Sequence, residues 1–278
     1  QGIRYRREGF DHFFVPAGQS YHPFEARVPG DFSSATFLAC AAAVTGSRVT
    51  LRGLDVSDPQ GDKAVLAILE QMGCAVEYGT EAITVAGPAD AFDTTAGHAR
   101  AGLGGGSFDL NAIPDALPAL AATACFSREP VELTNVAQAR AKETDRVAVM
   151  ARELAKMGGA VEEREDGLRV VPSAVAAHGG QGGGAAHGGE RGSRGDAGSR
   201  SAPPLHGAAV EGHSDHRVVM ALAVAALGAS GPTHINAAEA AAVTFPGFFD
   251  VLVSLRAEGG TPDTSGDEST PRVQTHKG

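Results

Sequence analysis

One layout of apolar and polar positions occurs three times along the chain. Residues 32–55 show a run of small apolar residues typical of a buried helix, then a glycine break, then an alternating run typical of a strand. Residues 113–136 and 213–237 repeat this layout. Repetition at this scale predicts that the chain is built from related α/β units that pack on one another.

A second half-unit follows each of these segments. Residues 60–85 and 142–171 each predict a helix followed by a strand or hairpin, and residues 244–260 give a shortened third copy. We therefore expect an α/β (α+β) fold of three repeated βαβαββ-like units, packed with pseudo-threefold symmetry.

Helix ends are marked by capping residues. Asp145 and Asp215 each precede an apolar periodic run and predict helix starts, whereas Gly158 and Gly228 predict helix ends. Pro114 suits the first turn of another helix, where its missing N–H costs nothing.

Composition sets limits on function. The chain has 278 residues, 42% of them apolar, and a formal net charge of −10, which argues against nucleic-acid binding. We find no run long enough to span a membrane and no signal peptide. The three cysteines, Cys40, Cys74 and Cys125, lie far apart and predict reduced core thiols in a cytoplasmic protein.

Two segments differ from this pattern. Residues 178–207 are rich in glycine and predict a flexible insert, while residues 261–278 predict a disordered tail. His178, His187 and His206 lie in the insert, where a solvated linker is favoured over a weak metal site.

Charged residues concentrate at three predicted helix starts, which are residues 111–115, 142–146 and 214–217. Because the units are related by repetition, these starts should meet at one end of the fold. Helix N-termini attract anions, and Arg side chains bind carboxylate and phosphate, so the sequence predicts an anion site there. Each feature alone has a simpler explanation, because an acidic residue at a helix start is usually a cap and a charged run is usually a solvated face.

The following motifs carry a resemblance to a known family: PGDFSSATFLA (29–39), QGD (60–62), NAIPDALPALA (111–121), RAKETDRVAVMARELAKMG (140–158), DHRVVMALAVAAL (215–227) and TFPGFF (244–249). Together they resemble the 5-enolpyruvylshikimate-3-phosphate synthase family over residues 10–257. The resemblance implies the enolpyruvyl transferase fold, with two domains and substrates in the cleft between them. It implies that residues 1–27 end an N-terminal domain, 28–30 form a hinge and 31–260 form the C-terminal domain.

The resemblance also implies a reaction, the transfer of the enolpyruvyl group of phosphoenolpyruvate to the 5-hydroxyl of shikimate 3-phosphate. Asp115 matches the base at the attacking hydroxyl, and Glu143 matches the proton donor and acceptor at the methylene carbon. Lys142 matches a residue that binds the hydroxyl and shuttles protons. Arg146 and Arg217 match the pair that binds the phosphoenolpyruvate carboxylate.

Three further positions complete this comparison. His216 matches a supporting residue that orients Glu143, and Gln138 stands where the family often has a substrate-binding Asn. Some members carry a phosphate-binding lysine where this chain has Val243. No metal or cofactor is implied, and both partners are small molecules.

Two alternatives differ in class from this enzyme. One is an inactive or degenerate fragment that retains only the phosphoenolpyruvate half-site, because family motifs expected upstream are absent from the sequence. The other is a purely structural repeat array, which predicts no charged cluster at the helix starts. We expect a monomer that needs an N-terminal domain for activity.

Overall fold

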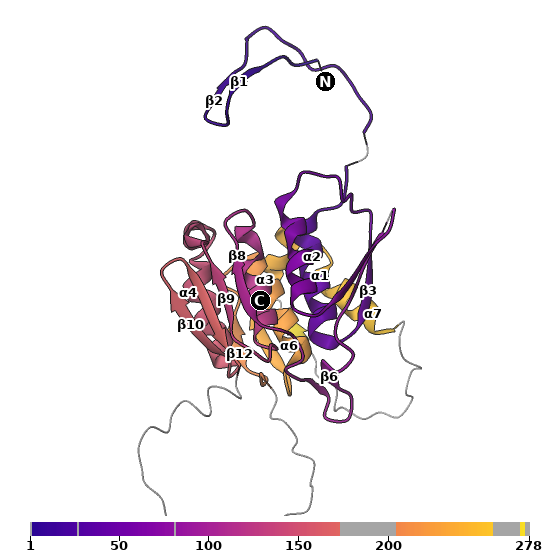
Figure 1. Cartoon of the computed structure of the whole chain (residues 1–278), viewed down its shortest axis with the longest axis vertical. Helices are drawn as coiled ribbons and strands as arrows, with labels where there is room; N and C mark the ends of the chain where they lie inside the picture. Colours follow the sequence, from indigo (N-terminus) through magenta and orange to yellow (C-terminus); the bar gives the residue numbers. More distant parts are fainter. Residues whose placement is uncertain (1, 27, 81, 173–203, 258–272, 276–278) are drawn as a thin grey trace, which may run out of the picture.

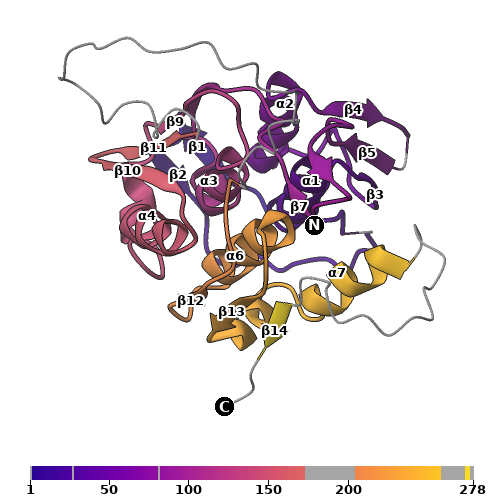
Figure 2. The same ribbon diagram turned by 90° about the horizontal axis from the view of Figure 1, so that it is seen from below.

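The computed structural model describes residues 2–26, 28–80, 82–172, 204–257 and 273–275. Within these ranges, three sheets of three or four strands and an outer set of helices surround three central helices (Figure 2). This arrangement follows the three-unit repeat of the sequence.

The first unit contains one central and one outer helix. Its elements are α1 (Phe32–Thr45), β3 (Arg48–Arg52), the 3-10 turn η1 (Gly61–Lys63), α2 (Ala64–Gln71), β4 (Ala75–Tyr78) and β5 (Ala82–Ala86). Asp31 caps α1 by accepting hydrogen bonds from the backbone N–H groups of Ser33 and Ser34, and Gly46 ends the helix at a φ of 63°. A short hairpin of β6 (Phe92–Asp93) and β7 (His98–Ala99) leads to the second unit.

The second unit shows the complete βαβαββ order. Its elements are β8 (Gly106–Asp109), η2 (Pro114–Ala116), α3 (Leu117–Ala124), β9 (Val131–Thr134), η3 (Ala137–Ala141), α4 (Arg146–Lys156), β10 (Ala160–Arg164) and β11 (Gly167–Val171). Pro114 lies in the first turn, as expected, and this turn is a 3-10 helix that continues into α3.

The third unit closes the fold. Its elements are β12 (Ala209–Glu211), α6 (His216–Gly228), β13 (Thr233–Asn236), η4 (Ala238–Val243), α7 (Phe248–Ala257) and β14 (Val273–Thr275). β14 lies in the tail that the sequence led us to expect to be disordered, but it pairs in parallel with β13. The pairing satisfies backbone groups along that edge of the sheet.

Strand order repeats between units, which confirms the predicted fold class. The first sheet has the order β3-β5-β4, and the second has β8-β9-β11-β10, so β3, β5 and β4 occupy the places of β9, β11 and β10. All pairs in these places are antiparallel, whereas the added strand β8 is parallel to β9. In the third sheet, β12 and β13 repeat the parallel pair.

The central helices α1, α3 and α6 are buried against one another and are rich in alanine (Figure 2). Small side chains let helices approach closely, and Gly228 marks such an approach. A Cβ atom at Gly228 would lie 2.6 Å from side-chain atoms of both Phe126 and Val44. The three cysteines are buried and free, as expected, and burial raises the pKa of each thiol to about 12.

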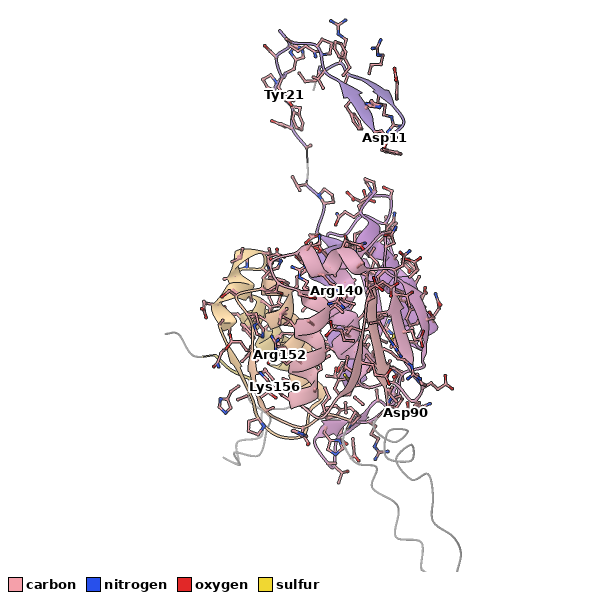
Figure 3. The ribbon with its side chains drawn as sticks, turned by 90° about the vertical axis from the view of Figure 1, so that its left-hand side faces the viewer. Asp11, Tyr21, Asp90, Arg140, Arg152 and Lys156 are labelled. Carbon is pink, nitrogen blue, oxygen red and sulfur yellow. The ribbon has the colours of Figure 1, made fainter. Side chains whose placement is uncertain are left out.

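An N-terminal arm stands apart from this body (Figure 1). It carries the hairpin of β1 (Arg6–Glu8) and β2 (His12–Phe14), and its aromatic side chains are exposed. Figure 3 shows Asp11 and Tyr21 on this arm, well away from the body.

Most of the glycine-rich insert, with His178 and His187, lies outside the described residues. The end of that segment differs from the flexible linker we expected, because Leu205 is buried and the backbone N–H of His206 donates to the carbonyl of Met157. Among the described residues, no helix is long and apolar enough to cross a membrane.

Candidate active site

The charged helix starts lie at the end of the body that faces the N-terminal arm. Figure 3 shows Arg140, just before α4, at this end, and Lys156, at the other end of α4, farther away. Asp145 caps α4 through the backbone N–H of Ala148, and Asp215 caps α6 through the N–H groups of Arg217 and Val218. The capping pattern thus gathers the polar residues of several helices at one end.

Arg146 is the centre of the charged cluster. Its side chain is 1% exposed, and its Nε lies 2.8 Å from Asp215 Oδ2. Its Nη1 lies 2.9 Å from Asp115 Oδ1, and its Nη2 lies 2.5 Å from Glu143 Oε2. One guanidinium therefore joins carboxylates from the starts of α3, α4 and α6.

Asp115 is shared among three cations. Besides Arg146, Lys142 Nζ lies 3.2 Å from its Oδ1 and Arg217 Nη2 lies 3.2 Å from its Oδ2. Burial opposes its ionisation, but the charges of Arg217, Arg146 and Lys142 outweigh this effect and hold the pKa of Asp115 below its ordinary value. Asp115 is therefore ionised at neutral pH.

Asp215 is buried completely and also remains ionised. Burial opposes its charge, but the hydrogen bond and charge of Arg146, together with the Arg217 backbone N–H, lower the pKa of Asp215. The hydroxyl of Thr144 donates to its Oδ2 at 3.1 Å. Asp215 thus fixes the start of α6 against the start of α4.

His216 and Glu143 approach each other without a hydrogen bond, since His216 Nδ1 lies 3.9 Å from Glu143 Oε1. Burial and the charge of Arg217 lower the pKa of His216, so this imidazole is neutral at pH 7. The Glu143 side chain is 48% exposed. Glu143 is thus the carboxylate of the cluster that faces solvent most openly.

Gln138 lies on η3 beside the 111–115 motif. Its Nε2 donates to the backbone carbonyl of Asn111 at 3.0 Å and lies 3.3 Å from the Asn111 side-chain oxygen. Val243, at the end of η4, has an exposed side chain.

The first unit contributes residues that the sequence reasoning missed. Arg217 Nη2 donates to the hydroxyl of Ser33 at 3.1 Å, which joins the start of α1 to the cluster. Asp62 on η1 interacts electrostatically with Arg217 and Asp115. Burial raises the pKa of Asp62, and the charge of Asp115 adds to this effect while Arg217 opposes it.

A signal for these residues existed in the sequence. Residues 31–34 occupy the same place in the first unit that residues 215–218 occupy in the third, so the repeat alone predicts that Ser33 lies at the same end. The first unit has no arginine at residues 31–34, so looking for cationic residues does not identify this helix start. Among the described residues, no group of three His, Cys, Asp or Glu side chains could hold a metal ion.

This arrangement can bind an anion and move protons. Arg217 and Lys142 present charge beside helix N-termini, and ionised Asp115 lies between them. Because Arg146 already contacts three carboxylates, an incoming carboxylate must compete with them for this guanidinium.

Comparison with known proteins gives the family context. The family model for EPSP synthase (3-phosphoshikimate 1-carboxyvinyltransferase) matches residues 2–252. The chain is 44% identical to a 3-phosphoshikimate 1-carboxyvinyltransferase of Ruminiclostridium cellulolyticum, over 91% of this chain and 50% of that protein. It is 41% identical to the protein of the same name from Acetivibrio thermocellus, over 92% of this chain and 51% of that protein.

Two solved structures are also similar to this chain. An EPSP synthase from Acinetobacter baumannii is 27% identical and matches with a TM-score of 0.64, over 91% of this chain and 52% of that one. The enolpyruvyl transferase NikO from Streptomyces tendae is 16% identical with a TM-score of 0.56 and supports the fold alone. The chain spans about half the length of the relatives it matches.

Proposed function

The chain belongs to the EPSP synthase family, and from this premise we propose that it takes part in transferring the enolpyruvyl group of phosphoenolpyruvate to the 5-hydroxyl of shikimate 3-phosphate. The observation that carries the proposal is the single network that joins Asp115, Lys142, Glu143, Arg146 and Arg217. These residues come from different helix starts, and a solvated charged face would not need them to share partners.

The reaction requires an addition followed by an elimination. In the addition, the 5-hydroxyl oxygen bonds to C2 of phosphoenolpyruvate, its proton leaves, and the methylene carbon gains a proton. In the elimination, the new methyl group loses a proton and the bond between C2 and the phosphate oxygen breaks. One group must therefore accept the hydroxyl proton, and another must give and retake a proton at carbon.

We assign the hydroxyl proton to Asp115. In the substrate-free structure its pKa is lowered by Arg217, Arg146 and Lys142, which makes it a weak base. When the substrate carboxylate occupies Arg217 and Arg146, their hold on Asp115 weakens, and its pKa rises toward the range a base needs. Substrate binding thus activates the base.

We assign the proton at the methylene carbon to Glu143, because its side chain is the most exposed carboxylate of the cluster. The neutral imidazole of His216 lies close enough to orient Glu143 after a small movement. Lys142 has one third of its side chain exposed and binds the hydroxyl beside Asp115. Gln138 contributes a shikimate 3-phosphate contact.

The length comparison supports a role for a second domain. We propose that residues 1–27 belong to that domain, that 28–30 form the hinge and that 31–260 form the catalytic C-terminal domain. The exposed side chains of Phe10, Tyr21 and Phe24 on the arm are consistent with such a contact. We further propose that the complete protein acts as a monomer in the cytoplasm.

The test is a coupled phosphate-release assay with phosphoenolpyruvate and shikimate 3-phosphate. It compares the chain alone with the chain joined to the N-terminal half of a relative. We expect release from the joined protein, with Asp115→Asn and Glu143→Gln each reducing turnover by roughly 10² to 10⁴-fold while the circular dichroism spectrum is unchanged. Undiminished release by both variants would refute these roles.

A further inference from the structure

Helix α4 contacts the turn before α6 at a second place, away from the charged cluster. Glu153, two turns after Arg146, is 0% exposed. Its Oε2 accepts the backbone N–H of Glu211 at 2.9 Å, and its Oε1 lies 3.0 Å from His213 Nε2. A buried carboxylate thus binds both the end of β12 and the turn that follows it.

That turn has an unfavourable backbone. His213 and Ser214 have φ values of 53° and 54°, and two consecutive residues with side chains rarely adopt this left-handed conformation. Such a conformation strains the backbone, so surrounding contacts must hold the turn in place. Glu153 supplies one set of these contacts, and the Asp215 backbone N–H adds another by donating to the Gly212 carbonyl.

The residues after the turn belong to the candidate site. Asp215 binds Arg146, and His216 and Arg217 begin α6. Helix α4 therefore holds this connection at two points, through Arg146 to Asp215 and through Glu153 to His213. Arg217 is the second residue of α6, so the turn directly precedes the start of the helix that carries it.

A simple ion pair on α4 does not account for Glu153. Arg152 and Lys156 do contact it, and Figure 3 shows both on α4 beside the orange part of the ribbon. Those two side chains are about half exposed, whereas Glu153 is buried and accepts a hydrogen bond from the backbone N–H of Glu211 on β12. Burial opposes its charge, but hydrogen bonds from Lys156, His213 and the Glu211 backbone lower its pKa to about 2.

We infer that Glu153 is a positioning residue, which holds the turn at 212–215 so that Arg217 and His216 face the anion site. This inference rests on the proposed function in one respect, which is the identity of the ligand that Arg217 binds. The geometry of the turn is independent of that ligand, so the two can be tested separately.

The experiment uses the full chain with Glu153→Gln and Glu153→Ala. Phosphoenolpyruvate is titrated by calorimetry at a temperature where every variant is folded. Amide exchange by NMR follows the N–H groups of Asp215, Arg217 and Val218, which bond within the turn or to the Asp215 side chain. Two controls are Glu77→Gln, which removes a carboxylate paired with Arg48 on an exposed strand, and Val170→Ala, which weakens the core in β11.

We expect Glu153→Ala to raise the Kd for phosphoenolpyruvate roughly tenfold, equivalent to about 1.4 kcal/mol, and to speed exchange at the three amides. Glu153→Gln keeps an acceptor for the Glu211 N–H and should recover part of both effects. Val170→Ala should lower the melting temperature but leave the Kd and the exchange of these amides unchanged. Glu77→Gln should leave both the Kd and the amide exchange unchanged.

The inference would be overturned if both Glu153 variants kept the Kd and the exchange rates within about twofold of the original chain. A twofold change is a difference well under 1 kcal/mol. If Glu153→Ala does not fold, Glu153→Gln decides by the same criteria. If neither the original chain nor the chain joined to the N-terminal half of a relative binds phosphoenolpyruvate, the proposed function is contradicted. The amide exchange still decides whether Glu153 holds the turn.

Discussion

At the scale of single residues, Arg146 has the most constrained position in the site. The sequence alone suggests a cation that binds substrate, because Arg146 matches a carboxylate-binding residue of the family. The structure gives it a further role, since it is buried and neutralises Asp215 and Asp115 before any substrate arrives. Sequence reasoning could not reveal this, because burial and partners depend on how the three units pack.

Removing Arg146 should therefore destabilise the fold. Arg146→Met leaves Asp215 buried without its main cation, and breaking a buried pair in this way costs about 3–5 kcal/mol. Urea unfolding followed by circular dichroism measures the loss. The double variant Arg146→Met/Asp215→Asn should be more stable than Arg146→Met alone, because it removes the uncompensated charge. A single variant as stable as the original chain would contradict the buried network.

At the scale of elements, the close approach of the central helices makes Gly228 sensitive. Gly228→Ala would place a methyl group against Phe126 and Val44, and overpacking of this kind costs about 1–3 kcal/mol. Gly104→Ala is the matched control, since its nearest neighbour would lie at an ordinary 3.6 Å. Thermal unfolding should show a lower melting temperature for Gly228→Ala and little change for Gly104→Ala. Equal melting temperatures would mean that the helices are not packed so tightly.

The elements themselves were largely predictable from local signals. Asp145, Asp215 and Gly228 mark helix ends in the sequence, and the structure ends its helices there. The left-handed turn at His213 and Ser214 was not predictable, because two consecutive residues with side chains rarely adopt that conformation and contacts from α4 help to hold it. Non-local pairing also explains why β14 was missed.

At the scale of the whole molecule, buried carboxylates should govern stability in acid. The pKa of Glu153 falls from 4.5 to about 2 on folding, and those of Asp115 and Asp215 also fall. A lowered pKa stabilises the fold above the unfolded-state value, and this contribution is lost as the pH falls through the folded-state value. The free energy of unfolding should therefore decrease between about pH 4.5 and 2.

Glu153→Gln tests this dependence. The variant lacks the titrating group, so its free energy of unfolding, measured with urea at several pH values, should fall less steeply across that window. The contribution of Glu153 is on the order of 3 kcal/mol at neutral pH. Parallel curves for the variant and the original chain would show that Glu153 keeps an ordinary pKa.

We propose that charged helix starts from all three units form one site for a small dianionic or trianionic ligand. The most direct measurement is a titration of the ¹⁵N-labelled chain with phosphoenolpyruvate, followed by amide chemical shifts. We expect saturable shifts that cluster at residues 31–34, 111–117, 142–148 and 214–218. Shifts that are absent, or that cluster at the opposite end of the body near Asp90, would contradict this proposal.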